Sequence, residues 1–107
     1  MVIVEFPSFT RAITALLSDD QYRDLQNALV DNPELGSLIP GTRGLRKVRW
    51  SMTGRGKRGG IRVIYYWWIS GEKLLMLAAY PKNVQDDLTP VQKKILTRLV
   101  IEELENG

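Results

Sequence analysis

The chain has 107 residues and a net charge of +3, with 44% apolar and 25% charged residues, which is typical of one soluble globular domain. It contains neither cysteine nor histidine, so disulfides, thiol catalysis and the usual zinc sites are excluded, and any general acid or base must be Lys, Tyr, Asp or Glu. Its longest apolar runs, residues 63–69 and 74–80, are seven residues each, whereas a membrane-spanning helix needs about 18. We therefore expect a cytoplasmic protein with no signal peptide, no membrane contact and no cofactor.

The first third of the chain predicts one strand and two helices. A short β-branched run at residues 2–6 is typical of a strand. Apolar residues at helical spacing follow Ser8, which we expect to cap the first helix. A second helix begins at the capping box Ser18-Asp19-Asp20-Gln21 and stops at Asn32-Pro33. We expect these two helices to pack as a hairpin.

The remainder predicts three strands and a final helix. Residues 34–44 contain Pro40 and three glycines and indicate a surface connection. Strands are expected at 45–50, 61–69 and 74–80, separated by a glycine-rich loop and a tight turn. The last of them is apolar on both faces, so it should lie in the sheet interior. The motif Thr89-Pro90-Val91-Gln92 begins the final helix. Its buried stripe is placed on Val91, Ile95 and Leu99, with Leu96 and Leu104 as further candidates.

The predicted order of elements is β-α-α-β-β-β-α, in a single domain over residues 1–107. Three consecutive strands with short links favour an antiparallel meander sheet packed against helices. The expected fold class is therefore α+β.

The positive charge is concentrated in one window. Residues 41–62 contain eight cations and no acid, whereas the rest of the chain holds seven cations and all twelve acids, a balance of −5. Short basic runs are often only solvated loops. Here the cations lie on two predicted strands as well as the loop between them, and six are arginine, which suits bidentate phosphate contacts. A polyanion, RNA or DNA, is the favoured partner.

This window could also support chemistry. Strand alternation places Arg62 one strand away from Lys47 or Arg49, depending on register, and the glycines of residues 54–60 let backbone N–H groups approach an anion. Like charges lower the pKa of a clustered lysine, which could then accept a proton near neutral pH while arginines hold phosphate. That combination could cleave an RNA backbone without histidine. Spacing alone favours binding without catalysis.

Two neighbouring features have both a structural and a functional interpretation. The run Tyr65-Tyr66-Trp67-Trp68 could stack unpaired bases, but aromatic residues in a central strand are more often core, which we favour for most of these. Lys82 follows the last strand. It is either an exposed surface residue without a function or a further cation in the patch around Arg62.

Four stretches together resemble the HigB branch of the RelE/ParE toxin superfamily. They are Gly41-Thr42-Xaa-Gly44-Leu45-Arg46-Lys47, Gly56-Lys57-Arg58-Gly59-Gly60-Xaa-Arg62-Xaa-Ile64-Tyr65-Tyr66, Tyr80-Xaa-Lys82-Asn83 and Asp87-Leu88-Thr89. The second stretch is fairly specific, and the likeness runs over nearly the whole chain. It implies a RelE-like fold and the toxin of a type II toxin–antitoxin module. RelE-like and HigB-like toxins cut mRNA in the ribosomal A site, without a metal, leaving a 2′,3′-cyclic phosphate. The implied partners are mRNA, ribosomal RNA and a HigA-like helix-turn-helix antitoxin, through which alone operator DNA would be bound.

The resemblance also implies which residues work. Two departures matter: Asn83 stands where RelE has an arginine, and no tyrosine occurs around Leu88. We therefore assign proton transfer to Lys57, with Tyr80 as an auxiliary group. The expected catalytic set is Arg62, Lys57, Lys82 and Tyr80, and the expected RNA-binding set is Arg46, Lys47, Arg49, Arg55, Arg58 and Asn83.

Two other classes of function remain open at this point. One is a ParE-like inhibitor of DNA gyrase on the same fold, against which the basic loop argues. The other is a nucleic-acid-binding domain with no catalytic activity, which the residues alone do not distinguish from a nuclease.

Overall fold

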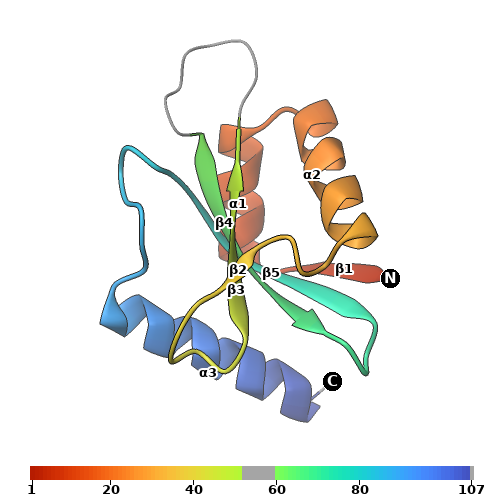
Figure 1. The fold of residues 1–107 in the computed structure, drawn as a ribbon, viewed down its shortest axis with the longest axis vertical. Helices are drawn as coiled ribbons and strands as arrows, with labels where there is room; N and C mark the ends of the chain where they lie inside the picture. Colours follow the sequence, from red (N-terminus) through yellow and green to blue (C-terminus); the bar gives the residue numbers. More distant parts are fainter. Residues whose placement is uncertain (52–59, 107) are drawn as a thin grey trace.

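A computed structural model describes residues 1–51 and 60–106 as a five-stranded sheet with three helices (Figure 1). The strands are β1 (Val2–Glu5), β2 (Ser37–Leu38), β3 (Leu45–Trp50), β4 (Ile61–Trp68) and β5 (Lys73–Pro81). The helices are α1 (Pro7–Leu16), α2 (Asp19–Asp31) and α3 (Pro90–Asn106). This arrangement confirms the predicted α+β class.

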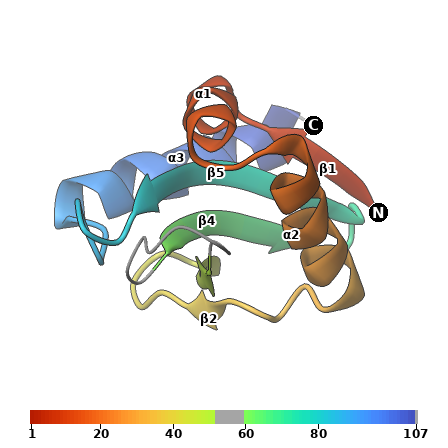
Figure 2. The same ribbon diagram turned by 90° about the horizontal axis from the view of Figure 1, so that it is seen from above.

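The sheet has the order β1-β5-β4-β3-β2, with β1 and β2 at opposite edges (Figure 2). Strands β3, β4 and β5 form the predicted antiparallel meander. Strand β1 adds to it in parallel with β5, which places β5 in the interior of the sheet as its apolar faces predict. The sheet is therefore mixed rather than purely antiparallel.

Two apolar cores lie on the two faces of this sheet. Helices α1 and α2 cover one face, where Phe9, Ile13 and Leu29 pack against alternate residues of β4 and β5. Helix α3 covers the other face, where Val100 and Leu104 pack against Leu75 and other residues of the sheet. Because β4 and β5 carry apolar side chains on both faces, each is buried from both sides.

Cap chemistry sets the helix boundaries. Ser18 and Gln21 form the predicted capping box of α2, and Thr89 and Gln92 bond reciprocally at the start of α3. Helix α1 differs, because it begins at Pro7 with Phe6 as an N-cap that has no side-chain bond, so Ser8 lies inside the helix and does not cap it.

Two further expectations need correction. A two-residue strand, β2, lies within the connection predicted over residues 34–44, and it pairs with β3. The buried stripe of α3 runs through Leu96, Val100 and Leu104, whereas Val91 and Ile95 are 67% and 54% exposed. The helix carries two apolar stripes, and it packs through the stripe of Leu96 and Leu104 rather than through that of Val91 and Ile95.

Candidate functional site

Cations from β3 and β4 meet a tyrosine from β5 on one face of the sheet. Cross-strand pairing aligns Arg49 with Arg62 and Arg62 with Tyr80, so these three residues form a row across three strands. Lys47 lies two residues before Arg49 and therefore projects from the same face of β3. This is the face that α3 covers further along the sheet. We call these four residues the cationic row.

The segment that follows β5, residues 82–89, brings two carboxylates to the cationic row. Nε of Arg62 donates to Oδ1 of Asp86 at 2.9 Å. Nζ of Lys47 is ion-paired with Asp87 and also donates to the backbone oxygen of Asp86 at 3.3 Å. The buried side chain of Leu88 anchors the segment, and the side-chain amide of Gln85 stabilises its internal conformation by donating to the backbone oxygen of Asp87 at 2.9 Å.

Burial separates the members of the cationic row. Arg62 is only 4% exposed, so the guanidinium lies beneath the surface, against Asp86. Lys47 is partly buried, and Arg49 is exposed. The expected convergence of cations is found for these residues, but Arg62 does not face open solvent. The carboxylates of residues 86 and 87 are paired with Arg62 and Lys47.

The titration behaviour of two groups reflects these contacts. The hydrogen bond from Arg62 lowers the pKa of Asp86, so this carboxylate stays ionised at neutral pH. Burial, followed by the charges of Asp87 and Asp86, raises the pKa of Tyr80 to about 12. Tyr80 is therefore protonated at neutral pH and acts as a hydrogen-bond donor, and its hydroxyl donates to the backbone oxygen of Asp86 at 3.4 Å.

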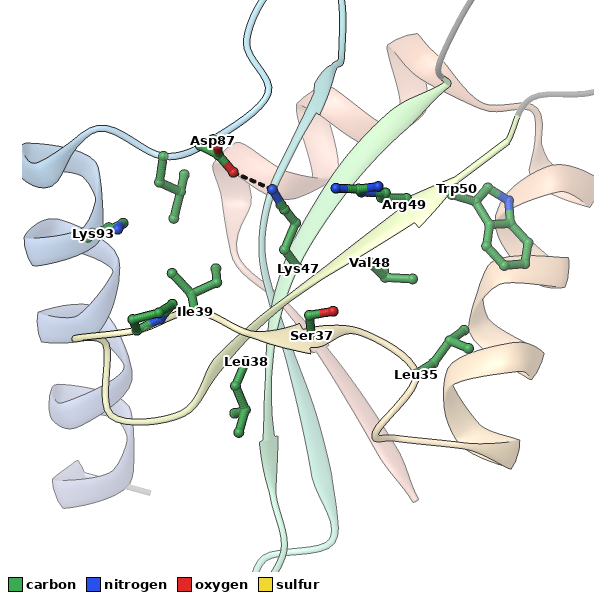
Figure 3. Close-up of a pocket in the computed structure, with 12 residues that line it drawn as sticks. Leu35, Ser37, Leu38, Ile39, Lys47, Val48, Arg49, Trp50, Asp87 and Lys93 are labelled. Atoms are coloured by element: carbon green, nitrogen blue, oxygen red, sulfur yellow. Dashed lines mark hydrogen bonds and ion pairs between the residues drawn. The ribbon is translucent and has the colours of Figure 1, made fainter.

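A hollow of about 810 Å³ lies beside the cationic row, between β2, β3 and α3 (Figure 3). Lys47 and Arg49 reach it from β3, and Lys93 reaches it from α3. Its other walls include the aliphatic side chains of Leu38 and Ile39. Asp87 also lines the hollow and pairs with Lys47, so Arg49 and Lys93 carry its excess positive charge, which suits a phosphate-containing ligand.

The other residues expected at the site are placed differently. Arg46 projects from the opposite face of β3, where it donates to the backbone oxygen of Gly36 at 2.7 Å and pairs with Glu34, so it does not join the cationic row. Lys82 and Asn83 are exposed at the end of β5. Lys57, Arg55 and Arg58 lie outside the described residues.

Three residues of the site escaped the sequence analysis as functional candidates. Asp86 and Asp87 lie outside the acid-free window, and only the resemblance to Asp87-Leu88-Thr89 pointed to their segment. Lys93 belongs to the final helix, whose sequence pattern predicts only an apolar stripe. Charged residues that flank a buried anchor such as Leu88 are a usable signal, because the anchor fixes where its neighbours lie.

Neither a metal cluster nor a membrane-spanning helix emerges from residues 1–51 and 60–106. No group of three or more potential carboxylate ligands is close enough there to hold a metal ion. No helix in the same residues is long and apolar enough to cross a membrane.

Comparison with known proteins identifies the fold. The sequence matches no protein-family model. Among solved structures, the chain is similar to an arginine-to-alanine double mutant of the E. coli toxin RelE in the free state, with a TM-score of 0.58. The match covers 79% of this chain and 86% of that chain at 12% sequence identity. At that identity the likeness establishes a RelE-like fold, as the resemblance predicted, and its function must be argued from the site.

Proposed function

We propose that this protein is the toxin of a type II toxin–antitoxin module and a ribosome-dependent mRNA endonuclease that acts in the cytoplasm. The observation that carries the proposal is the cationic row, in which Arg49, Arg62 and Tyr80 lie side by side on a RelE-like sheet next to Lys47. The finer assignment, to the HigB branch with a HigA-like helix-turn-helix antitoxin that binds operator DNA, rests on the sequence resemblance.

In this proposal the row holds the scissile phosphate. RNA phosphate oxygens replace the carboxylates of Asp86 and Asp87 on Arg62 and Lys47, because these side chains already present donors at that position. The ribose 2′-oxygen then attacks phosphorus and the 5′-oxygen leaves, giving a 2′,3′-cyclic phosphate and a 5′-hydroxyl. Arg62 stabilises the negative charge on the non-bridging phosphate oxygens in the transition state, an effect worth about a few kcal/mol for one well-placed donor.

Protonation supports the role of Tyr80, and the other roles rest on the sequence resemblance. Tyr80, which is neutral at physiological pH, donates a hydrogen bond and does not accept the 2′ proton. Lys57 and Lys82 are proposed to transfer protons, and Arg55, Arg58 and Asn83 to contact RNA. Arg46 is not proposed to contact RNA, because on the opposite face it donates to the backbone oxygen of Gly36 and forms an ion pair with Glu34.

Arg62→Lys tests the proposal, with Arg46→Lys as a matched control on the other face of the same strand pair. Both changes retain charge and remove the planar guanidinium. Mapping mRNA 5′ ends after incubation with ribosomes should show cleavage by the wild type. Arg62→Lys should lower the single-turnover rate by about 10- to 100-fold, and Arg46→Lys should leave it unchanged. Arg62→Ala should also abolish toxicity on expression.

A second candidate function is nucleic-acid binding without cleavage. It is favoured by the burial of Arg62 and by its ion pair with Asp86. A wild-type protein that binds RNA but leaves every transcript intact, with and without ribosomes, would support this candidate and contradict the nuclease. Arrest of replication before translation would instead support gyrase inhibition.

A further inference from the structure

A second basic groove lies next to the hollow beside the cationic row. It has a volume of about 760 Å³ and runs between the turn at residues 40–44 and one side of α3. Four cations line it, namely Arg43, Lys93, Lys94 and Arg98. Lys93 and Pro40 line both spaces, so the groove adjoins the hollow at a cation that both share.

Hydrogen bonds fix the conformation of the turn that forms one wall of the groove. Thr42 is buried, and its hydroxyl donates to the backbone oxygen of Ile39 at 2.6 Å and accepts from the backbone N–H of Leu45 at 3.2 Å. The hydroxyl of Thr97 on α3 donates to the backbone oxygen of Thr42 at 3.4 Å. These bonds hold the turn against the helix, so the two walls of the groove are connected.

Arg43 adopts an unusual backbone conformation in this turn. Its φ of 61° lies in the left-handed region, which costs a residue with a side chain about 1 kcal/mol. The Arg43 side chain is exposed and lines the groove. The backbone of the turn therefore directs this guanidinium to the groove at a cost in stability.

The charges of α3 also oppose the stability of the helix. Lys93 and Lys94 lie in its first two turns, while Glu102 and Glu105 lie near its end, which is the reverse of what the helix dipole favours. Lys94 and Arg98 are four residues apart, where like charges repel by about 0.2–0.5 kcal/mol, while Arg98 and Glu102 attract each other at the same spacing. Within residues 1–51 and 60–106, no ion pair neutralises the four groove cations. A bound anion would relieve both effects.

We propose that this groove binds the sugar–phosphate backbone of RNA outside the cleavage site. The inference rests on the proposed function, since it extends the same positive surface. Four cations that form no ion pair in the described part of the chain lie beside a turn that is hydrogen-bonded to α3. They suit a polyanion that passes along α3 toward the cationic row. Glu102 and Glu105 line the far end of the groove and set the limit of the RNA path. The RNA could be the message or the ribosome's own, and the chemistry is shared.

The test uses the double variant Lys94→Gln/Arg98→Gln. Its matched control, Arg11→Gln/Arg23→Gln, removes the same charge from exposed positions on α1 and α2, across the sheet. Binding is measured at several salt concentrations to a single-stranded RNA oligonucleotide and, separately, to ribosomes without mRNA. Thermal unfolding followed by circular dichroism verifies that both variants are folded.

The groove variant should bind about tenfold more weakly, and the salt dependence of log K should fall by about one for each cation that contacts phosphate. The control should bind like the wild type. A loss confined to ribosomes identifies ribosomal RNA as the ligand, and a loss on both probes identifies any RNA backbone. Groove-variant binding equal to the control overturns the inference. RNA binding that survives while binding of a cognate antitoxin is lost overturns it too, in favour of a protein partner.

The two proposals fail separately. Cleavage of mRNA by the wild type tests the nuclease, whereas the binding difference between the two double variants tests the groove. In the nuclease assay the groove variant should raise KM with little change in kcat, because its residues bind RNA equally before and during the reaction.

Discussion

Arg62 of β4 is held by Asp86, a residue that follows β5, through a hydrogen bond of 2.9 Å between Nε and Oδ1. The guanidinium is buried, while the Asp86 side chain is 47% exposed. The carboxylate therefore lies between Arg62 and solvent, and any phosphate bound by Arg62 would have to compete with it. The neighbouring pair of Lys47 with Asp87 repeats this arrangement nearer the surface.

Neutralising the carboxylate should strengthen anion binding. Asp86→Asn retains an acceptor for Arg62 but removes the charge that competes with phosphate. We expect roughly fivefold tighter binding of an RNA oligonucleotide, measured by fluorescence anisotropy. Asp24→Asn, an exposed position on α2, is the control for net charge. Equal affinities of the two variants would mean that Asp86 does not compete with RNA.

The raised pKa of Tyr80 predicts how stability changes in alkali. In the unfolded chain Tyr80 ionises near its ordinary pKa of 10.0, whereas in the folded protein it ionises at about 12. The unfolded state therefore loses its proton first, and the contribution of Tyr80 to stability falls as pH rises from 10 toward 12. The difference in free energy of unfolding between the wild type and Tyr80→Phe should shrink over this range. A difference that is constant with pH would contradict the assignment.

Tyr65 should be important for the sheet edge that carries β2. Its buried hydroxyl donates to the backbone oxygen of Pro33 at 2.7 Å and accepts from the backbone N–H of Gly36 at 2.9 Å. Tyr65→Phe leaves both backbone groups without this partner and should lower the free energy of unfolding by about 1–3 kcal/mol. Tyr66→Phe, at the half-buried neighbouring position, is the control and should change it far less. Urea denaturation measures both.

Gly60 should tolerate no side chain. Its φ is +60°, and an added Cβ would lie 2.1 Å from the backbone oxygen of Trp50, so the start of β4 would have to move away from β3. Gly41 has a φ of +77° and open space around it, so a substitution there measures the cost of the backbone conformation alone. Gly41→Ala should cost about 1 kcal/mol, and Gly60→Ala considerably more. Similar losses for the two variants in thermal denaturation would show that the Trp50 contact relaxes easily.

The elements that could be predicted are those whose signals are local. The capping box at Ser18 fixes the start of α2, and the run of β-branched and aromatic residues at 61–69 covers all of β4 and extends one residue beyond its end. The two-residue strand β2 could not be predicted in this way. Its pairing depends on β3 and on the Tyr65 hydroxyl, both distant in sequence.

The candidate site was predictable in one respect only. Alternation and charge put Lys47, Arg49 and Arg62 on the right strands, but their register was open until pairing placed Arg49 opposite Arg62. The carboxylates that cover the cations were missed, because electrostatic partners from a distant loop leave no periodic signal. The packing face of α3 was misjudged for a related reason: two apolar stripes were available, and only the sheet selects between them.

The parallel pairing of Ile3 with Leu74 constrains how the protein can fold as it is synthesised. The first strand emerges from the translation machinery long before its partner exists, because synthesis proceeds at about 5–20 residues per second. Until β5 arrives, α1 and α2 have only part of the surface against which they pack, and Arg62 lacks its neighbour Tyr80. A nascent chain therefore cannot complete the cationic row until β5 has been synthesised.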